Sequence, residues 1–261
     1  MGQLVNEIPQ WESVSLEGQP NTLFLRNHLL LSLPASELQE LRHHLEPYRF
    51  RQREILYEPP QKLRFVYFPN DGLVSLVATT EDGGTVEAGM VGKEGLVGLA
   101  SIAGMARCPL RQVVQIPSDG LKIRVAHMQA AIKSAFHFQS VICRYAIIMG
   151  TQIAQMAACN RLHDTGQRLA RWLLMARDRV DLDSLPVTHD FLANILGTDR
   201  PSVSLAAKVL QRQAIIAHKR GVITIRNHRR LESASCECYR IIRSLTQKSP
   251  VPQITKTAKS K

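Results

Sequence analysis

One window near the C-terminus, residues 188–227, constrains the fold more than any other part of the chain. Thr188 stands where a side-chain oxygen can accept hydrogen bonds from the first amides of a helix, and Phe191 and Ile195 follow with the spacing of one buried helical face. Gly197 suits the left-handed backbone conformation that ends many helices. The pattern therefore predicts a short amphipathic helix that ends at Gly197.

A second helix is predicted directly after this turn and runs to about residue 212. Asp199 is placed to cap it, and Pro201 costs little there because first-turn amides have no partner within the helix. Its predicted buried stripe consists of Val203, Ala206, Ala207 and Leu210, and the residues left to face outwards are Arg200, Ser202, Ser204, Lys208 and Gln211. Two helices joined by a short glycine-containing turn match the helix-turn-helix arrangement that enters the major groove of DNA.

Two short strands are predicted after the second helix, at residues 215–218 and 222–226, on either side of Lys219-Arg220-Gly221. Such a hairpin is the wing of a winged helix-turn-helix, and its tip is basic. An ordinary core fragment is the alternative, because short helix pairs with an intervening glycine are common in globular proteins. The order of the capping residues and the basic hairpin favour DNA binding.

The chain's positive charge is concentrated in its last third. Residues 184–261 hold 14 lysines and arginines against 4 acidic residues, whereas residues 1–183 hold 19 against 18. Basic side chains displace the counterions condensed on phosphates, so double-stranded DNA is the expected partner. A membrane partner is disfavoured, because these basic residues do not line one apolar helix. Residues 248–261 are expected to form a disordered basic tail.

Length and composition fit a protein of two compact domains. The chain has 261 residues and 44% hydrophobic content, which is enough for two cores. No stretch approaches the ~20 uninterrupted apolar residues of a membrane span. The N-terminus lacks the basic-then-apolar pattern of a signal peptide. We therefore expect a cytoplasmic protein.

The N-terminal part begins with helical patterns. Residues 1–22 are polar without a clear period and are expected to form a flexible arm. Residues 23–33 and 37–45 then have the pattern of two short helices.

A strand-rich segment follows, from residue 48 to about residue 124. Short apolar runs alternate with turn residues, and the clearest runs are residues 65–68, 73–78 and 85–91. Regularly spaced strands with Gly-rich turns predict a small antiparallel barrel or roll. Four closely spaced glycines come next: Gly92, Gly95, Gly98 and Gly104. They could let backbone amides approach an anion, but turns that close the roll are the favoured interpretation.

Residues 125–160 are helical in pattern and unusually apolar. Two adjacent faces are apolar or uncharged, and they hold Val141, Tyr145, Ile148, Gln152 and Gln155, with Ile142, Met149, Ile153 and Met156 alongside. A helix that is apolar over so much of its circumference must bury more than one side. A parallel two-helix dimer contact is the favoured interpretation, and an internal core helix is the alternative. Asp164 then opens another predicted helix, residues 165–180.

The five cysteines form no recognisable metal pattern in the sequence. Cys236 and Cys238 are a lone pair with no second pair at metal spacing. The other candidates for metal binding or catalysis are dispersed along the chain: Cys108, Cys143, Cys159 and His163. Without an export signal, an odd number of cysteines fits reduced structural thiols. We expect neither a metal site nor an enzyme.

This order of elements resembles the family of the cyclic-AMP receptor protein and the fumarate–nitrate reduction regulator, called Crp/Fnr. The resemblance covers roughly residues 23–228 and is most specific at residues 164–170 and 188–224. It implies an α+β homodimer with a cyclic-nucleotide-binding-like antiparallel β-roll that senses a signal, a long dimerisation helix and a C-terminal winged helix-turn-helix. RNA polymerase is a further candidate partner. The implied division is a sensor domain at 23–131, the dimerisation helix at 132–161, the DNA-binding domain at 162–228, and a C-terminal helix and tail at 229–261.

The resemblance also assigns DNA-reading positions. Arg200 occupies the family's first base-reading position, where a guanidinium can donate two hydrogen bonds to guanine. Pro201 and Leu205 stand where the family usually has a glutamate and a second reading arginine, so the family's familiar operator is not expected. The candidate DNA-binding residues are Thr188, His189, Asp199, Arg200, Ser202, Val203, Ser204, Lys208, Lys219 and Arg220. An architectural DNA-binding protein with little sequence specificity is the alternative.

The predicted sensor end departs further from the family. Members that bind cyclic nucleotides carry a glutamate for the ribose after a glycine, whereas Gly95 is followed here by Leu96, and Arg111 corresponds only loosely to the phosphate-binding arginine. Gly95 and Arg111 are the candidate effector-binding residues. A cyclic nucleotide is not supported as a cofactor. An iron–sulfur cluster is not expected either, because no cysteine precedes Cys108.

Overall fold

The computed structural model describes residues 25–247; the predicted arm at 1–22 and the predicted tail at 248–261 lie outside these described residues. The first helix is shorter than the sequence predicts, because Asn27 caps it by accepting hydrogen bonds from the amides of Leu29 and Leu30. It is α1, His28–Leu31. The second helix, α2, spans Ala35–Arg42.

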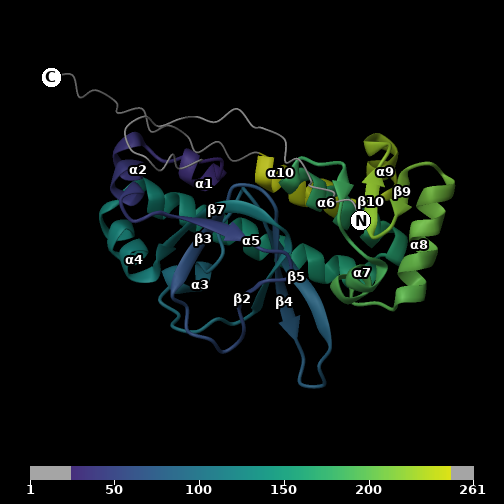
Figure 1. The fold of residues 1–261 in the computed structure, drawn as a ribbon, viewed down its shortest axis with the longest axis horizontal. Helices are drawn as coiled ribbons and strands as arrows, with labels where there is room; N and C mark the ends of the chain where they lie inside the picture. The colour runs from purple at the N-terminus through teal and green to yellow at the C-terminus, as the bar shows by residue number, and fades with distance from the viewer. Residues whose placement is uncertain (1–24, 248–261) are drawn as a thin grey trace, which may run out of the picture.

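Two antiparallel sheets form the predicted roll. The strands are β1 (Glu46–Phe50), β2 (Ile55–Tyr57), β3 (Phe65–Pro69), β4 (Leu73–Thr79), β5 (Thr85–Val91), β6 (Arg111–Ile116) and β7 (Ser118–Arg124). One sheet has the order β1-β7-β3 and the other β2-β6-β4-β5 (Figure 1). A short helix, α3 (Leu99–Ile102), lies between β5 and β6. The antiparallel roll is confirmed.

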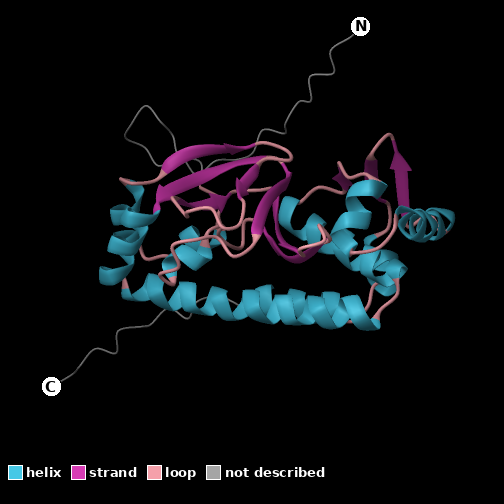
Figure 2. Ribbon diagram, turned by 90° about the horizontal axis from the view of Figure 1, so that it is seen from below, coloured by secondary structure: helices cyan, strands magenta, loops and turns pink. Residues whose placement is uncertain are grey.

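A long helix runs along one side of the molecule (Figure 2). It is α5, Phe136–Leu162, and α4 (Val125–Ser134) precedes it, with the helical path interrupted at Ala135. Val141, Tyr145 and Met149 are buried against the roll within the same chain. The apolar face named in the sequence is therefore an internal core face, and the dimer interpretation passes to the opposite, exposed face.

By length and composition, α5 is also the one helix within residues 25–247 that could cross a membrane. The core helix of a soluble protein passes the same test. Here one face of α5 packs on β5 of the roll and on the C-terminal helix α10 (Cys238–Gln247). Internal packing therefore accounts for much of its apolar content.

The C-terminal domain starts with α6, Thr165–Val180, as predicted. Asp164 and Gln167 form a reciprocal capping box at its start, which satisfies backbone amides that have no helical partner. The elements that follow are β8 (Ser184–Leu185), α7 (His189–Leu196), α8 (Arg200–Arg212), β9 (Ile216–Lys219), β10 (Val222–Ile225), α9 (His228–Ala234) and α10. The three strands make a small antiparallel sheet of order β8-β10-β9. Trp172 and Leu169 of α6 lie in the centre of the domain core.

The roll and the C-terminal domain are joined by buried polar contacts, which we call the junction: Glu87 with Trp172, and Arg179 with Glu94 and Gln152. The Trp172 indole Nε1 donates to Glu87 at 3.0 Å. The Arg179 guanidinium lies 2.7 Å from Glu94 and donates to Gln152 of α5 at 2.9 Å. Leu73, Met90 and Ile116 of the roll belong to the same apolar core as α6. The two domains are thus packed as one body.

Close packing also explains the glycine-rich segment after β5. A Cβ atom at Gly95 would lie 2.2 Å from the Tyr145 hydroxyl, and one at Gly92 would lie 2.7 Å from a carbon of Arg179. Both positions therefore let α5 and α6 approach the loop. The four glycines also lie in turns, as the favoured interpretation predicts: the Gly95 amide donates to the Gly92 carbonyl at 3.1 Å, and Gly98 and Gly104 have positive φ.

Candidate nucleic-acid interface

The helix-turn-helix is built by the caps that the sequence predicts. The Thr188 hydroxyl accepts a hydrogen bond from the Phe191 amide at 3.2 Å, and Gly197 ends α7 with φ 58° in the left-handed region. Asp199 then caps α8 by accepting from the Ser202 amide at 2.7 Å, with Pro201 in the first turn. These local contacts fix where α8 begins. They also direct its N-terminus away from the core.

The outer face of α8 lies at the end of the molecule away from α2 and α4 (Figure 1). Its exposed residues are Arg200, Pro201, Leu205, Lys208, Val209 and Arg212. Leu205 is 66% exposed, and Val209 is 45% exposed. The face is therefore partly apolar and partly basic, which fits a surface that contacts both thymine methyl groups and phosphates.

Val203 does not belong to this face. Its side chain is fully buried in the core of the C-terminal domain, together with Ala207 and Leu210. Its inclusion among the candidate DNA-binding residues was wrong, because the helical period that exposes Leu205 turns Val203 inwards.

Arg200 extends from the start of α8 into solvent. Its side chain is 66% exposed and forms an ion pair with Asp190 of α7 at 3.2 Å. An exposed pair of this kind contributes little stability and exchanges readily with water. The guanidinium can therefore pass to a DNA acceptor at small cost.

Two histidines join the reading helix to the wing. The His189 ring stacks on His218 of β9, with centroids 4.4 Å apart, and its Nδ1 lies 3.0 Å from the Ser204 hydroxyl. Burial lowers the pKa of His189, and the charges of His218 and Arg200 lower it further. A neutral ring at this position keeps α7, α8 and the wing packed together. These contacts connect α7, α8 and the wing through His189 and Ser204.

The wing is the hairpin of β9 and β10, and it turns at Arg220 and Gly221. Both residues have positive φ, 50° and 78°, as the two central residues of a type I′ hairpin turn require. Lys219 and Arg220 are exposed at the tip. The wing thus presents two cations beside α8.

The C-terminal domain matches a known family. Residues 167–234 match the sequence model of the Crp-like helix-turn-helix domain. FixK2 from Bradyrhizobium japonicum has a similar structure, with a TM-score of 0.64 at 17% identity over 74% of this chain and 98% of that one. The chain has the fold of a Crp/Fnr-type transcription regulator. The predicted resemblance is confirmed.

Other solved structures share this Crp/Fnr-type fold. The c-di-GMP-responsive global regulator CLP of Xanthomonas campestris gives a TM-score of 0.61 at 16% identity, covering 74% of this chain and 99% of that one. A CRP-family transcriptional regulator from Thermus thermophilus, TTHB099, gives 0.59 at 21% identity, with coverages of 72% and 96%. Comparison with curated proteins gave no match. At these identities the likeness establishes the fold.

The two candidate effector residues of the Crp/Fnr-type roll have separate surroundings. Gly95 lies under Tyr145 of α5, and its carbonyl accepts a hydrogen bond from Asn27 at 2.8 Å. Arg111, the first residue of β6, forms an ion pair with Glu58 at 2.8 Å. Both groups are engaged in contacts within the chain.

One cavity lies beside the roll, between α1 and α5. Its volume is about 110 Å³, and His28, Glu94, Arg144 and Tyr145 are among its lining residues. Sites for drug-sized ligands usually enclose ~300–1,000 Å³. The cavity is therefore smaller than a usual site for a ligand of that size.

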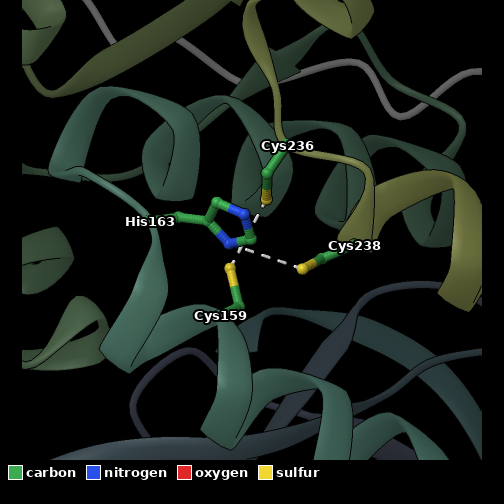
Figure 3. Close-up of side chains that lie close together, drawn as sticks. All are labelled: Cys159, His163, Cys236 and Cys238. Atoms are coloured by element: carbon green, nitrogen blue, oxygen red, sulfur yellow. Dashed lines mark hydrogen bonds between the residues drawn. The ribbon is translucent and has the colours of Figure 1, made fainter.

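The structure brings together four residues that the sequence analysis left apart. Cys159, His163, Cys236 and Cys238 have their ligand atoms within 4.8 Å of one another (Figure 3). The prediction that Cys159 lies apart from the Cys236-Glu-Cys238 pair was wrong. The chain returns through α9, which places this pair beside the end of α5. Two local half-patterns, Cys-x3-His and Cys-x-Cys, were the signal in the sequence, and the 72 intervening residues concealed their pairing.

Proposed function

We propose that this protein is a homodimeric transcription regulator that binds DNA sequence-specifically by inserting α8 into the major groove. The observation that carries the proposal is the exposed face of α8, which stands beside a basic wing on a capped, rigid helix pair. Cations on the helix and the wing contact phosphates, and side chains near the start of α8 reach base edges. The proposed partner is therefore double-stranded DNA, and the proposed location is the cytoplasm.

Arg200 is the proposed base-reading residue. Its guanidinium is held at the N-terminus of α8, where it can donate two hydrogen bonds to guanine O6 and N7. Pro201 offers no side-chain acceptor, and Leu205 offers an apolar contact to a thymine methyl. Thr188, Asp199, Ser202, Lys208, Lys219 and Arg220 complete the proposed contact set. The operator should therefore differ from that of the cyclic-AMP receptor protein.

The proposed dimer forms through the exposed face of α5, which we call the seam. The seam consists of Phe136, Ser140, Cys143, Ile147, Gly150, Ala154 and Ala157, all exposed in the single chain. Their spacing alternates between four and three residues, the heptad period of a two-helix contact. Ile147 is 71% exposed, which is unfavourable unless a second helix covers it.

Signal transmission is proposed to run through the junction. The turn of the helix-turn-helix approaches the roll directly, since a Cβ atom at Gly197 would lie 3.2 Å from Val86 of β5. A signal that changes the roll would shift its packing on α5 and α6. The two recognition helices of a dimer would then change their spacing relative to half-sites ~34 Å apart.

Selection of bound fragments from random DNA tests this proposal. The purified protein should enrich a two-fold symmetric consensus with half-sites one helical turn apart. Ile147→Glu places a charge in the seam without disturbing the core of the single chain, and it should give a monomer that enriches no symmetric site. Enrichment of asymmetric or unrelated fragments by the unchanged protein would reject the proposal and favour an architectural DNA-binding protein.

A further inference from the structure

The four-residue cluster at the end of α5 is formed by two segments of different domains. Cys159 and His163 lie one helical turn apart at the C-terminus of α5, and Cys236 and Cys238 stand between α9 and α10. The three cysteines are buried and form a small core of their own. Figure 3 shows the three sulfur atoms arranged around the imidazole of His163.

The distances within this cluster suit one tetrahedral ion. The sulfur atoms of Cys159 and Cys236 are 3.5 Å apart, and the Cys238 sulfur is 3.6 Å from His163 Nδ1. Around a zinc ion with bonds of about 2.3 Å to sulfur and 2.0 Å to nitrogen, tetrahedral geometry separates two sulfurs by about 3.8 Å and sulfur from nitrogen by about 3.5 Å. These two observed separations lie within about 0.3 Å of the tetrahedral values, and all four ligand atoms lie within 4.8 Å of one another. Ligands bound to separate irons of an iron–sulfur cluster lie further apart, so one ion fits better.

Neighbouring groups orient the same atoms. His163 Nε2 lies 3.3 Å from a carboxylate oxygen of Glu237, which leaves Nδ1 free to point at the sulfurs. A carboxylate that accepts the second ring N–H is the usual support of a metal-binding histidine. Gln155 of α5 donates its side-chain amide to the Cys238 sulfur at 3.1 Å. Such a donor stabilises a thiolate.

Two buried cations lie beside the cluster. Arg168 and Arg171 of α6 are both buried, and Arg171 donates to the sulfurs of Met156 and Met175, which are weak acceptors. The Nε atoms of both arginines lack a hydrogen-bond partner among the described residues. Three thiolates and one imidazole around Zn²⁺ carry a net charge of −1, which these guanidinium groups would offset. Arg171 also lies near the junction carboxylate Glu87.

We propose that Cys159, His163, Cys236 and Cys238 form a structural Zn²⁺ site that fixes the C-terminal helix α10 to the end of α5. Binding replaces three thiol protons, which pass to solvent, with three sulfur–zinc bonds, and the neutral imidazole adds the fourth bond through Nδ1. The closed four-ligand set leaves no position for substrate, as in structural sites. The ion would tie the helix that carries the proposed dimer seam to the domain that carries α8.

Metal content and coordination test this site directly, without reference to DNA binding. The full chain, reduced and supplied with zinc chloride alone, should bind one zinc per chain after desalting. X-ray absorption at the zinc edge should show three sulfurs at about 2.3 Å and one nitrogen at about 2.0 Å. Cobalt(II) in place of zinc should show the absorption of tetrahedral thiolate coordination.

Variants separate this site from incidental binding. Cys238→Ser and His163→Ala should lose the stoichiometric zinc, whereas Cys143→Ser, at an exposed cysteine of the same helix, should keep it. Glu237→Gln should weaken zinc binding by about 10–100-fold. Zinc removal should also speed amide hydrogen exchange in α10.

Three results would overturn the proposal. They are substoichiometric zinc in the unchanged protein, a coordination shell without three sulfurs, and a disulfide between Cys159 and Cys236 in place of the metal. If Cys238→Ser does not fold, the absorption spectrum of the unchanged protein still decides. Because these readouts are independent of DNA, failure of the zinc site leaves the proposed DNA binding standing, and the reverse also holds.

Discussion

Two faces of the C-terminal domain carry arginines in opposite surroundings. The front is the exposed face that holds Arg200, and the back is the face packed on the roll and α5, which holds Arg179. On the front, Arg200 is 66% exposed and pairs with an equally exposed Asp190. On the back, Arg179 is 7% exposed and is held by Glu94, Gln152 and the Met175 carbonyl. The front cation can exchange its partner for DNA at little cost, whereas the back cation is fixed. The comparison separates an exposed face, where the proposed DNA contacts lie, from a buried face that joins the domain to the roll.

The largest expected effect is on the free energy of unfolding, and it comes from removing the Arg179–Glu94 ion pair at the back. Arg179→Ala leaves the mostly buried Glu94 without its cation and should reduce the free energy of unfolding by about 3 kcal/mol, because removing one partner of a buried pair is strongly destabilising. Urea unfolding followed by circular dichroism measures it. Arg177→Ala, on the same helix but in an exposed pair with Asp183, should cost less than about 1 kcal/mol. An equal loss of unfolding free energy in the two variants would show that the buried Arg179 pair contributes no more than an exposed pair.

The next effect concerns the carboxyl group at the junction. Burial raises the pKa of Glu87 from 4.5 to about 7. The folded protein therefore binds this proton more tightly than the unfolded chain, so stability falls as pH rises from about 4.5 to about 7 and then levels. This group contributes a loss of up to about 3 kcal/mol over that window.

Glu87→Gln should remove that pH dependence. Thermal unfolding between pH 5 and pH 7.5 should show a smaller decline for the variant than for the unchanged protein, because the amide that replaces the carboxyl group has no proton to lose in this range. Glu40→Gln, at an exposed position, is the control and should leave the decline as it is. A decline of the same size in both variants would show that Glu87 does not titrate in this range.

Sequence reasoning was most successful where structure is local. Thr188 and Asp199 accept from amides three residues ahead, and Gly197 ends α7 through its own left-handed backbone, so this local pattern predicts α7, the turn and α8 with correct bounds. The strand runs at 65–68, 73–78 and 85–91 likewise predict β3, β4 and β5 closely. Val203 was placed both in the predicted buried stripe of the second helix and among the candidate DNA-binding residues, and its burial confirms only the first.

Contacts between segments that are distant in the sequence could not be predicted from it. The Cys159–Cys236 contact joins residues 77 positions apart. The sequence does not indicate which other cysteine or histidine lies next to the Cys236-Glu-Cys238 pair in the fold. The buried face of α5 was seen, but whether the roll or a second helix covers it depends on tertiary packing. The close approaches at Gly92 and Gly95 were missed for the same reason.

On the front, Arg200→Ala should reduce operator affinity by about 1–3 kcal/mol and relax preference at one base position. Arg200→Lys keeps the charge but loses the two-pronged geometry, so it should lose the base preference while keeping the salt dependence. Binding to a series of single-base operator variants measures both. An unchanged base preference in Arg200→Ala would show that α8 is placed wrongly on DNA.

The smallest expected effect is at the wing. Lys219→Ala should weaken binding to all sequences alike and reduce the slope of log affinity against log salt by about 1, because one phosphate contact is lost. Lys62→Ala, an exposed lysine of the roll, should leave the slope unchanged. A change in base preference in Lys219→Ala would place the wing in a groove instead of on the backbone.

The most direct test of the central claim is the affinity ratio between a selected operator and a scrambled duplex of the same composition, measured by competition at physiological salt. Sequence-specific reading by α8 predicts a ratio of about 10³ or more for the unchanged protein. Arg200→Ala should lower it. A ratio near one would contradict the account and leave only sequence-independent binding by the basic domain.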